Sequence, residues 1–350
     1  MLSIIICSKH RTLNSNLLEN IRMTIGTEFE IIHIDNSNRK YGICSAYNEG
    51  VRRSKGDILC FMHEDILYHS SGWGKIVENF MQDYKVGMLG VAGSAIVSNV
   101  SDWRFGGYQF VHIVQGYQTL SNPPYYYTKG IEWDTEESPK RVVIIDGCWF
   151  CLRKESFIKD MLWFDEETFR GFHLYDSDIS MQVNKTGKHI YICSNIIIEH
   201  FSKGIYTFDF KDGLSKFLRK WKDDLPYSII DINEYDLRKL NKQAETKLEK
   251  RIKQDGLTTM IKKYFTDIHS GCVPPQLPKE AEQLIEASMY QFVKAKIKFS
   301  ATNDEAFSAV KTYIYMQKKS HAWRIIWKYL YYRVLNRTRI KQIKRKNNYQ

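Results

Sequence analysis

Short apolar runs alternate with polar or helix-compatible segments over about the first 205 residues of the chain. Each run is rich in β-branched residues and short for a helix, so the runs predict buried strands. Between them, residues 15–25 place apolar side chains on one helical face, and residues 44–56 predict a short helix that Gly56 closes. The predicted strands are residues 2–7, 29–35, 57–62, 86–97, 141–152 and 188–200.

The alternation of strands and helices predicts an α/β domain with a mixed, largely parallel sheet flanked by helices. In such a sheet the functional sites lie beyond the carboxyl ends of the strands. From about residue 206 the pattern becomes helical, and the proline-containing segment 271–280 predicts a connector. We therefore expect an α/β domain over residues 1–205 and a helical C-terminal region over residues 206–350. The helices predicted there are residues 212–225, 233–254, 278–299 and 304–335.

The composition of the 350-residue chain, 43% hydrophobic and 26% charged, is typical of a soluble globular protein. No apolar stretch approaches the roughly 20 residues of a membrane span. The N-terminal MLSIIICSKH has no charged leader before its apolar run, so we expect a cytoplasmic protein. The seven cysteines predict reduced core thiols. Cys148 and Cys151 form a CxxC pair, but a strand would point them to opposite faces, so no zinc site is expected.

The formal net charge of +11 is concentrated at the C-terminus. Residues 306–350 hold twelve Lys or Arg and no acidic residue, which leaves a net charge of −1 for residues 1–305. This distribution gives no broad phosphate-binding face, so no nucleic-acid partner is expected. The last predicted helix is amphipathic and basic. It is a candidate for contact with the inner leaflet of a membrane, and the alternative is packing against its own domain.

Polar residues gather where the first three predicted strands end. The stretch ILCFMHEDILYHSSGW begins as a buried strand and then presents His63, Glu64 and Asp65. Ionisable groups at such a position are costly to desolvate unless they are paired or bound to a metal, so they predict a site; the alternative is a solvated loop. Ser8 ends the first strand. Asp35 ends the second, where open α/β sheets commonly hold a ribose hydroxyl.

The passage IIHIDNSNRKYGICSAYNEGVRRSKGDILCFMHEDI, residues 31–66, resembles the nucleotide-sugar-binding half of family 2 glycosyltransferases, which have the GT-A (Rossmann-like) fold. It is most similar to their capsule-type glycosyltransferase-like branch, in which His63 stands for the first Asp of a DxD-type motif. The resemblance implies that Asp65 is the last Asp of that motif and holds Mn²⁺ or Mg²⁺ against the donor diphosphate. His63 would suit Mn²⁺ better. The donor-binding residues that it implies are Ser8, Asp35, Asn48, Glu64 and Asp65.

The stretch GFHLYDSDISMQVNKTGKHIYI, residues 171–192, resembles the acceptor-side element of the family, usually Glu-Asp-x-Asp before a helix. Tyr175 replaces the Glu, and Asp176 takes the place of the Asp that acts as general base in inverting transfer. The alternative is that this acidic segment caps the helix. IIDGCWFCLRKESF, residues 144–157, matches the Asp-Gly element of the family. The acceptor-binding residues that the resemblance implies are Asp146, Gly147, Trp149 and Asp178.

Two further segments complete the resemblance. His200 follows the last predicted strand, where the family often has a His that completes the cation site; a hydrogen-bonded structural His is the alternative. The implied metal ligands are therefore His63, Asp65 and His200. The aromatic loop NPPYYYTKGIEW, residues 122–133, could stack on sugar rings or pack on the surface.

The resemblance implies an inverting, metal-dependent glycosyltransferase that moves a sugar from a nucleotide-sugar to a hydroxyl of a glycan or lipid-linked acceptor. A UDP-sugar is the expected donor, and surface polysaccharide biosynthesis is the expected pathway. One alternative is a sugar nucleotidyltransferase, which would want a Gly-rich phosphate loop that CSKHRTLNSN lacks. Another is a non-catalytic sugar- or membrane-binding protein, which the departures at His63 and Tyr175 would permit. Retention of Asp65, Asp176 and His200 favours the enzyme.

Overall fold

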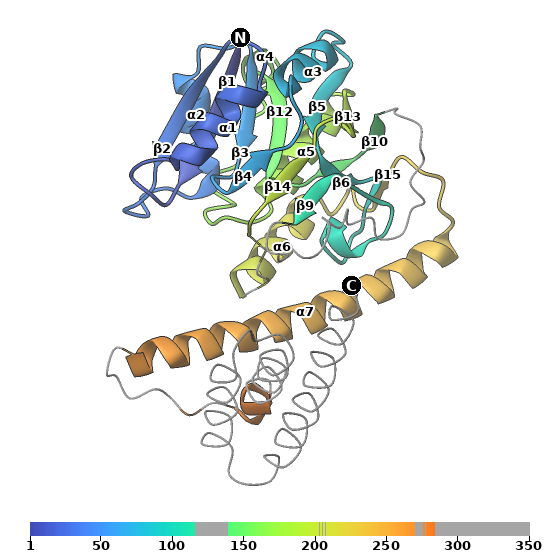
Figure 1. Cartoon of the computed structure of the whole chain (residues 1–350). Coiled ribbons are helices and arrows are strands. Elements are labelled where there is room, and N and C mark those ends of the chain that lie inside the picture. The colour runs from blue at the N-terminus through green and yellow to red at the C-terminus, as the bar shows by residue number, and fades with distance from the viewer. Residues whose placement is uncertain are drawn as a thin grey trace, which may run out of the picture. The chain divides into compact units, whose positions relative to one another are not determined.

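The computed structural model describes residues 1–115, 139–202, 204, 206, 208–269, 276 and 278–283. The chain has two compact units, Met1–Lys253 and Gln254–Gln350. Among the described residues, the first unit is built on a seven-stranded sheet (Figure 1). In spatial order, its strands are β10 (Lys140–Val142), β13 (His189–Ile192), β5 (Val86–Gly90), β12 (Trp149–Arg153), β3 (Ile58–Met62), β1 (Leu2–Ser8) and β2 (Phe29–Asp35).

The sheet is mixed and largely parallel. β1 pairs in parallel with β2 and β3, and β13 with β5, whereas β12 and β10 run antiparallel to their neighbours. The central strands are buried on both faces, as their continuous apolar sequences require. The fold class predicted from the sequence is therefore confirmed. The helices that pack on this sheet and its edges are α1 (Ser15–Thr24), α2 (Ile43–Arg53), α3 (Trp73–Phe80), α4 (Lys154–Lys159) and α5 (Tyr175–Lys185).

Three apolar runs that each predicted one strand are divided in the structure, so the prediction of single strands was wrong. Residues 86–97 form β5, β6 (Ala92–Ser94) and β7 (Ile96–Val97). Residues 141–152 cover most of β10, then β11 (Ile144–Ile145) and most of β12, and residues 188–200 form β13 and β14 (Ile198–His200). Because β6, β7 and β11 are buried like the main sheet, hydrophobicity alone does not mark where these runs leave it.

The divided runs enter smaller sheets beside the main one. Among the described residues these sheets have the strand orders β11-β6-β8, β4-β14-β9 and β15-β7. They bring residues after β5, before β12 and after β13 to one side of the main sheet (Figure 1). The remaining elements there are β4 (Ile66–Tyr68), β8 (Gln109–Val111), β9 (Ile113–Gln115), β15 (Tyr227–Ser228) and the 3-10 turn η1 (Trp103–Phe105).

Gly56 does not close α2, which corrects the sequence prediction. The helix ends at Arg53, with Ser54 as its C-cap residue. Gly56 instead lies against the start of β1, where its N–H donates to Ser3 Oγ over 2.8 Å. A Cβ on Gly56 would lie 2.6 Å from the Met1 carbonyl oxygen, so this position needs a glycine for close backbone approach.

The region after the sheet is helical. α6 (Phe208–Lys220) begins and ends earlier than predicted, and α7 (Glu234–His269) extends beyond residue 254. In the described part of the chain, no helix is both long and apolar enough to cross a membrane. The aromatic loop 122–133, the basic tail 306–350 and the predicted helix 304–335 lie outside the described residues, as does most of 278–299. The domain boundary near residue 205 stays a prediction.

Candidate active site

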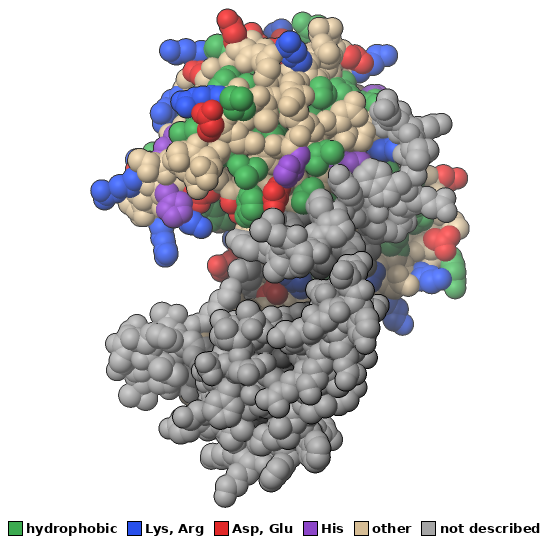
Figure 2. Space-filling model, in the orientation of Figure 1, with side chains coloured by type: hydrophobic (Ala, Val, Ile, Leu, Met, Phe, Trp, Pro, Cys, Tyr) green, Lys and Arg blue, Asp and Glu red, His purple; other side chains and the backbone are tan. Residues whose placement is uncertain are grey.

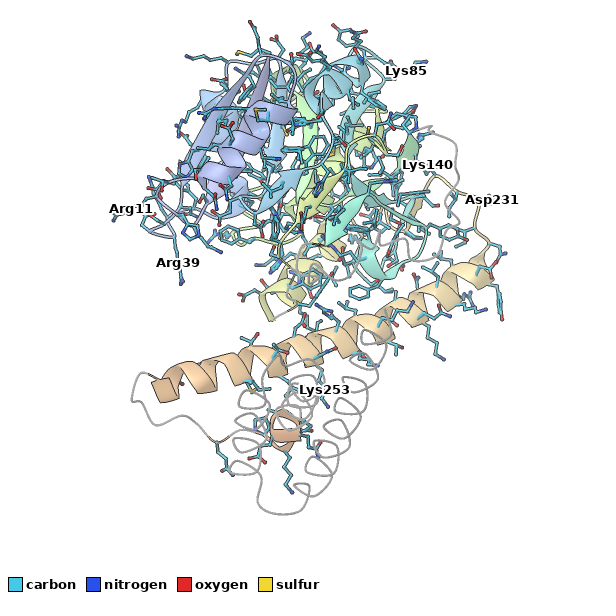
Figure 3. All side chains as sticks on the ribbon, in the orientation of Figure 1. Arg11, Arg39, Lys85, Lys140, Asp231 and Lys253 are labelled. Carbon is cyan, nitrogen blue, oxygen red and sulfur yellow. The ribbon has the colours of Figure 1, made fainter. Side chains whose placement is uncertain are left out.

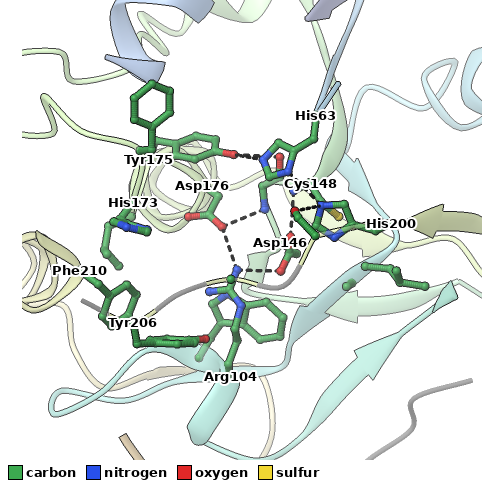
Figure 4. Close-up of a pocket in the computed structure, with 18 of the residues that line it drawn as sticks. His63, Arg104, Asp146, Cys148, His173, Tyr175, Asp176, His200, Tyr206 and Phe210 are labelled. Carbon is green, nitrogen blue, oxygen red and sulfur yellow. Dashed lines mark hydrogen bonds and ion pairs between the residues drawn. The ribbon is translucent and has the colours of Figure 1, made fainter. Parts of the chain in front are cut away.

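A cavity of about 560 Å³ opens beside the carboxyl end of β3 (Figure 4). Five separate segments contribute polar side chains to it. His63 follows β3, Arg104 belongs to η1, Asp146 follows β11, Asp176 lies in the first turn of α5, and His200 ends β14. The division of the apolar runs is what makes this convergence possible, since β11 and β14 both branch away from the main sheet.

His63, Asp65 and His200 form a candidate cation site. Their ligand atoms all lie within 4.8 Å of one another. His63 Nδ1 is 3.2 Å from His200 Nε2, which is 3.4 Å from Asp65 Oδ1. Two imidazole nitrogens and a carboxylate oxygen are a donor set that suits Mn²⁺, so the residues fit the cation that the resemblance implied.

The protonation of this cluster also fits a cation. Burial and then the charge of His200 lower the pKa of His63 to about 4, so its ring is neutral at pH 7, as a ligand must be. Burial raises the pKa of the Asp65 carboxyl, but the hydrogen bond and charge of His200 outweigh it and hold that pKa well below its usual range. The carboxylate is therefore charged near pH 7.

Asp176 is a buried carboxyl at the amino end of α5 that lines the same cavity. Its Oδ2 accepts a hydrogen bond from the Gly147 N–H over 2.8 Å, and its Oδ1 accepts one from the Ser177 N–H over 2.9 Å. Burial raises the pKa of Asp176 to about 6, against the lowering effect of Arg104. A carboxyl with such a pKa is deprotonated at neutral pH and remains a competent proton acceptor.

Arg104 holds the carboxylates of this cavity together. Its guanidinium nitrogens lie 2.8 Å from Asp102 Oδ2, 2.7 Å from Asp146 Oδ2 and 3.6 Å from Asp176 Oδ2. Burial raises the pKa of Asp146, but the Arg104 charge and the hydrogen bond from the Cys148 N–H together outweigh it and keep that pKa well below its usual range. Sequence reasoning missed Arg104 because it follows no predicted strand and matches no motif.

Residues 3–204 match the model of a protein family, the glycosyltransferase-like family. The chain belongs to this family. The resemblance seen in the sequence is thereby confirmed, and the motifs that carried it all lie within the matched residues.

Among solved structures, GalNAc-T7 with UDP, GalNAc and Mn²⁺ is 14% identical to this glycosyltransferase-like chain, with a TM-score of 0.41. The alignment covers 73% of this chain and 56% of that one, so this chain spans little more than half of GalNAc-T7. TarS 1-349 from S. aureus is 12% identical, with coverages of 91% and 93% and a TM-score of 0.40. At such scores neither adds to the assignment, which rests on the family match. No curated protein sequence matches the chain significantly.

Three of the predicted donor-side residues, Ser8, Asp35 and Glu64, lie at the carboxyl edge of the sheet and do not line the cavity. The Ser8 hydroxyl donates a hydrogen bond to Glu64, whose second oxygen is 3.8 Å from Lys9 Nζ. Asp35 pairs in register with Ser8 and is exposed. These groups therefore form a partly exposed polar rim beside the cation cluster.

Asn48 and Trp149 have their polar groups engaged in the interior. The Asn48 amide donates to the Phe164 carbonyl over 2.9 Å and accepts from the Phe164 N–H over 3.1 Å. Trp149 is fully buried, and its Nε1 donates to the Tyr68 hydroxyl over 2.9 Å. Neither side chain lines the cavity, whereas the predicted Asp146 and Gly147 do.

Asp178 faces α6 rather than the cavity. Its carboxylate accepts hydrogen bonds from Trp221 Nε1 over 2.9 Å and from Gln182 Nε2 over 2.8 Å, and Lys220 Nζ is 2.8 Å from its Oδ1. Residues two apart on a helix face different directions, so the two aspartates of the motif have different surroundings. Asp176 points into the cavity, and Asp178 ties α5 to α6.

Asp178→Ala is expected to lower the free energy of unfolding by about 1–3 kcal/mol, because Trp221 and Lys220 lose their buried acceptor. Urea unfolding measures the change. Asp224→Ala is the matched control, since Asp224 pairs with Lys185 at the surface, where such pairs contribute less than about 1 kcal/mol. Equal losses in the two variants would contradict the structural role of Asp178.

Arg104→Met is expected to raise the pKa of Asp176 above 6, because the guanidinium is the main group that opposes the effect of burial. Carbon-13 NMR of labelled aspartate carboxyls, followed between pH 4 and 9, measures the change, and Asp176→Asn assigns the resonance. Arg52→Met, on α2 and outside the cavity, is the matched control. An unchanged midpoint in Arg104→Met would show that Arg104 does not set the protonation of Asp176.

Proposed function

We propose that the chain is an inverting, metal-dependent glycosyltransferase that uses a nucleotide-sugar, with a UDP-sugar as the expected donor. The acceptor is a hydroxyl of a glycan or lipid-linked acceptor. The proposed location of the enzyme is the cytoplasm, and the proposed pathway is the biosynthesis of surface polysaccharide. One observation carries the proposal: two members of the candidate cation cluster, His63 and His200, line the same cavity as Asp176, a buried carboxyl with a raised pKa (Figure 4). Neither feature alone distinguishes transfer from simple binding.

His63, Asp65 and His200 would hold the cation, which supplies positive charge to the donor diphosphate as the glycosidic bond breaks. In the proposed reaction, the acceptor hydroxyl oxygen forms a bond to the anomeric carbon while the bond from that carbon to the phosphate oxygen breaks. The bonding electrons leave with the diphosphate, and Asp176 takes the hydroxyl proton. Attack opposite the leaving group inverts the anomeric centre.

The aromatic lining of the cavity supports a sugar as the acceptor. Tyr206 packs edge-on against Phe210 and Phe105, with ring centroids 4.5 and 5.3 Å apart. Trp103 and Phe172 line the same cavity. Aromatic rings bury apolar surface at little conformational cost and can face the C–H side of a pyranose ring. Carboxylates beside them provide acceptors for the sugar hydroxyls.

The direct test is release of nucleotide from a panel of UDP-, GDP-, CMP- and dTDP-sugars, with water or an added oligosaccharide as the acceptor. We expect release from one nucleotide class, dependent on Mn²⁺ or Mg²⁺, and a product of inverted anomeric configuration by proton NMR. Retention of configuration would exclude the assigned role of Asp176. Failure of every donor to bind or react with the folded protein would favour the non-catalytic alternative.

A further inference from the structure

The two departures from the family pattern contact each other. His63 stands where the DxD-type motif has its first Asp, and Tyr175 stands where the acceptor-side element has its Glu. They are 112 residues apart in the sequence, yet His63 Nε2 lies 3.1 Å from the Tyr175 hydroxyl (Figure 4). Two unrelated losses of function would have no reason to meet. The contact instead suggests that the two residues act as a pair.

The direction of the hydrogen bonds determines where the His63 proton lies. Tyr175 has one hydroxyl hydrogen, and it is donated to the Gly147 carbonyl over 2.9 Å, since a carbonyl can only accept. His63 Nε2 must therefore be the donor in its contact with the same hydroxyl oxygen. In a neutral imidazole, protonation of Nε2 leaves Nδ1 with its lone pair. That nitrogen is the one that faces His200.

Gly147 makes this arrangement sterically possible. A Cβ at this position would lie 2.2 Å from the Tyr175 hydroxyl oxygen, so any larger residue would displace the ring. The ring has little room to move, because it packs against Tyr47 and Phe164 with centroids 5.7 and 6.5 Å apart. The absence of a side chain at Gly147 therefore allows the Tyr175 hydroxyl to contact both the Gly147 carbonyl and His63.

We propose that Tyr175 is a positioning residue for the cation site: it fixes His63 as the Nε2–H tautomer and so turns the Nδ1 lone pair toward His200 and Asp65. This inference rests on the proposed function, because it assigns His63 to the cation. A neighbouring acceptor that orients a ligating imidazole is a general device of metal sites, and its loss typically costs about 10- to 100-fold in metal affinity.

The first test needs no substitution at Tyr175. Proton-detected nitrogen-15 NMR of histidine-labelled, metal-free protein distinguishes a protonated from an unprotonated ring nitrogen, and His63→Gln assigns the His63 signals. We expect Nε2 to be protonated and Nδ1 unprotonated. The opposite tautomer, or an even mixture, would overturn the proposal.

The second test compares Tyr175→Phe with Tyr47→Phe. Both substitutions remove one buried hydroxyl from the same aromatic cluster, but of the two hydroxyls only that of Tyr175 contacts His63 Nε2 and the Gly147 carbonyl. Thermal unfolding establishes that both variants fold. We expect Tyr175→Phe to lose the tautomer preference of His63 and to weaken Mn²⁺ binding, measured by the EPR signal of free Mn²⁺, about 10- to 100-fold. Tyr47→Phe should preserve both.

Failure of the inference and failure of the proposed function give different results. If wild-type protein binds Mn²⁺ and Tyr175→Phe binds it equally well, the positioning role is wrong and the proposed function stands. If wild-type protein does not bind Mn²⁺, the metal-dependent function is contradicted. In that case the nitrogen-15 measurement still decides whether Tyr175 sets the His63 tautomer.

Discussion

Asp176→Asn is expected to lower kcat by about 10²- to 10⁴-fold, the usual contribution of a positioned general base. The amide oxygen can still accept the hydrogen bond from the Gly147 N–H, so the local fold should persist. What is lost is the capacity to take a proton from the acceptor hydroxyl. We therefore expect unchanged nucleotide affinity by calorimetry together with a severe loss of turnover by nucleotide release.

The matched control is Asp178→Asn, two residues along the same helix. Asp178 is as buried as Asp176, but it binds Lys220 at the end of α6 and Trp221 just after it, and its carboxylate does not line the cavity. This variant should lose stability and keep most of its turnover at a temperature where it remains folded. A comparable loss of turnover in both variants would mean that disturbance of α5, and not loss of a general base, lowers the activity of Asp176→Asn.

The activity of the wild type should also follow the protonation of Asp176. Since burial raises its pKa to about 6, the base is progressively lost as the pH falls below 6.

Asp65→Ala is expected to weaken Mn²⁺ binding by more than about 100-fold, because even groups that only orient a ligand typically cost 10- to 100-fold. Asp65 is the only carboxylate in the described cluster, so its removal leaves only the two imidazole rings as ligands. Donor turnover should fall with the loss of the cation. EPR of free Mn²⁺ measures the binding, and excess Mn²⁺ should not restore turnover at concentrations that saturate the wild type.

Asp57→Ala is the control for this change. Asp57 is exposed in the turn that precedes β3, whereas Asp65 follows the carboxyl end of that strand. Its loss removes the same charge from the protein without touching the cluster. Mn²⁺ affinity that falls equally in both variants would mean that the ion binds by general surface charge, and the cluster would not be the cation site.

The sequence predicted three strands of the main sheet and the convergence of their ends because both depend on local patterns. The β-rich runs ending at Ser8, Asp35 and Met62 gave β1, β2 and β3, and parallel pairing brought their ends to one edge. The family motifs predicted that Asp65 and Asp176 matter. In the structure Asp65 lies in the candidate cation cluster and Asp176 lines the cavity.

The parts that sequence did not predict depend on direction in three dimensions. Arg104 shows no local pattern, yet it contacts the neighbouring Asp102 and two carboxylates from distant segments, Asp146 and Asp176. Trp149 and Asn48 share motifs with cavity residues, but their side chains point into the interior. Tyr175 looked like a loss from the acceptor-side element until its contact with His63 was visible.

On the face drawn in Figure 2, His, acidic, basic and apolar side chains lie interspersed, and Figure 3 shows side chains on all the described elements. Only the contacts between particular side chains single out a site. The same holds along the chain, where three carboxylates near the cavity have different tasks. Asp146 pairs with Arg104, Asp178 binds Lys220 of α6, and Asp176 lines the cavity as a buried carboxyl with a pKa near 6.

The central claim is that His63, Asp65 and His200 present a cation to the diphosphate of a nucleotide-sugar. The most direct measurement is isothermal titration calorimetry of UDP-, GDP-, CMP- and dTDP-sugars into the wild-type protein, with Mn²⁺ and with a chelator. We expect one nucleotide class, the UDP-sugars, to bind in the presence of Mn²⁺ and not to bind in the chelator. Equal binding with and without Mn²⁺, or no binding to folded protein, would contradict it.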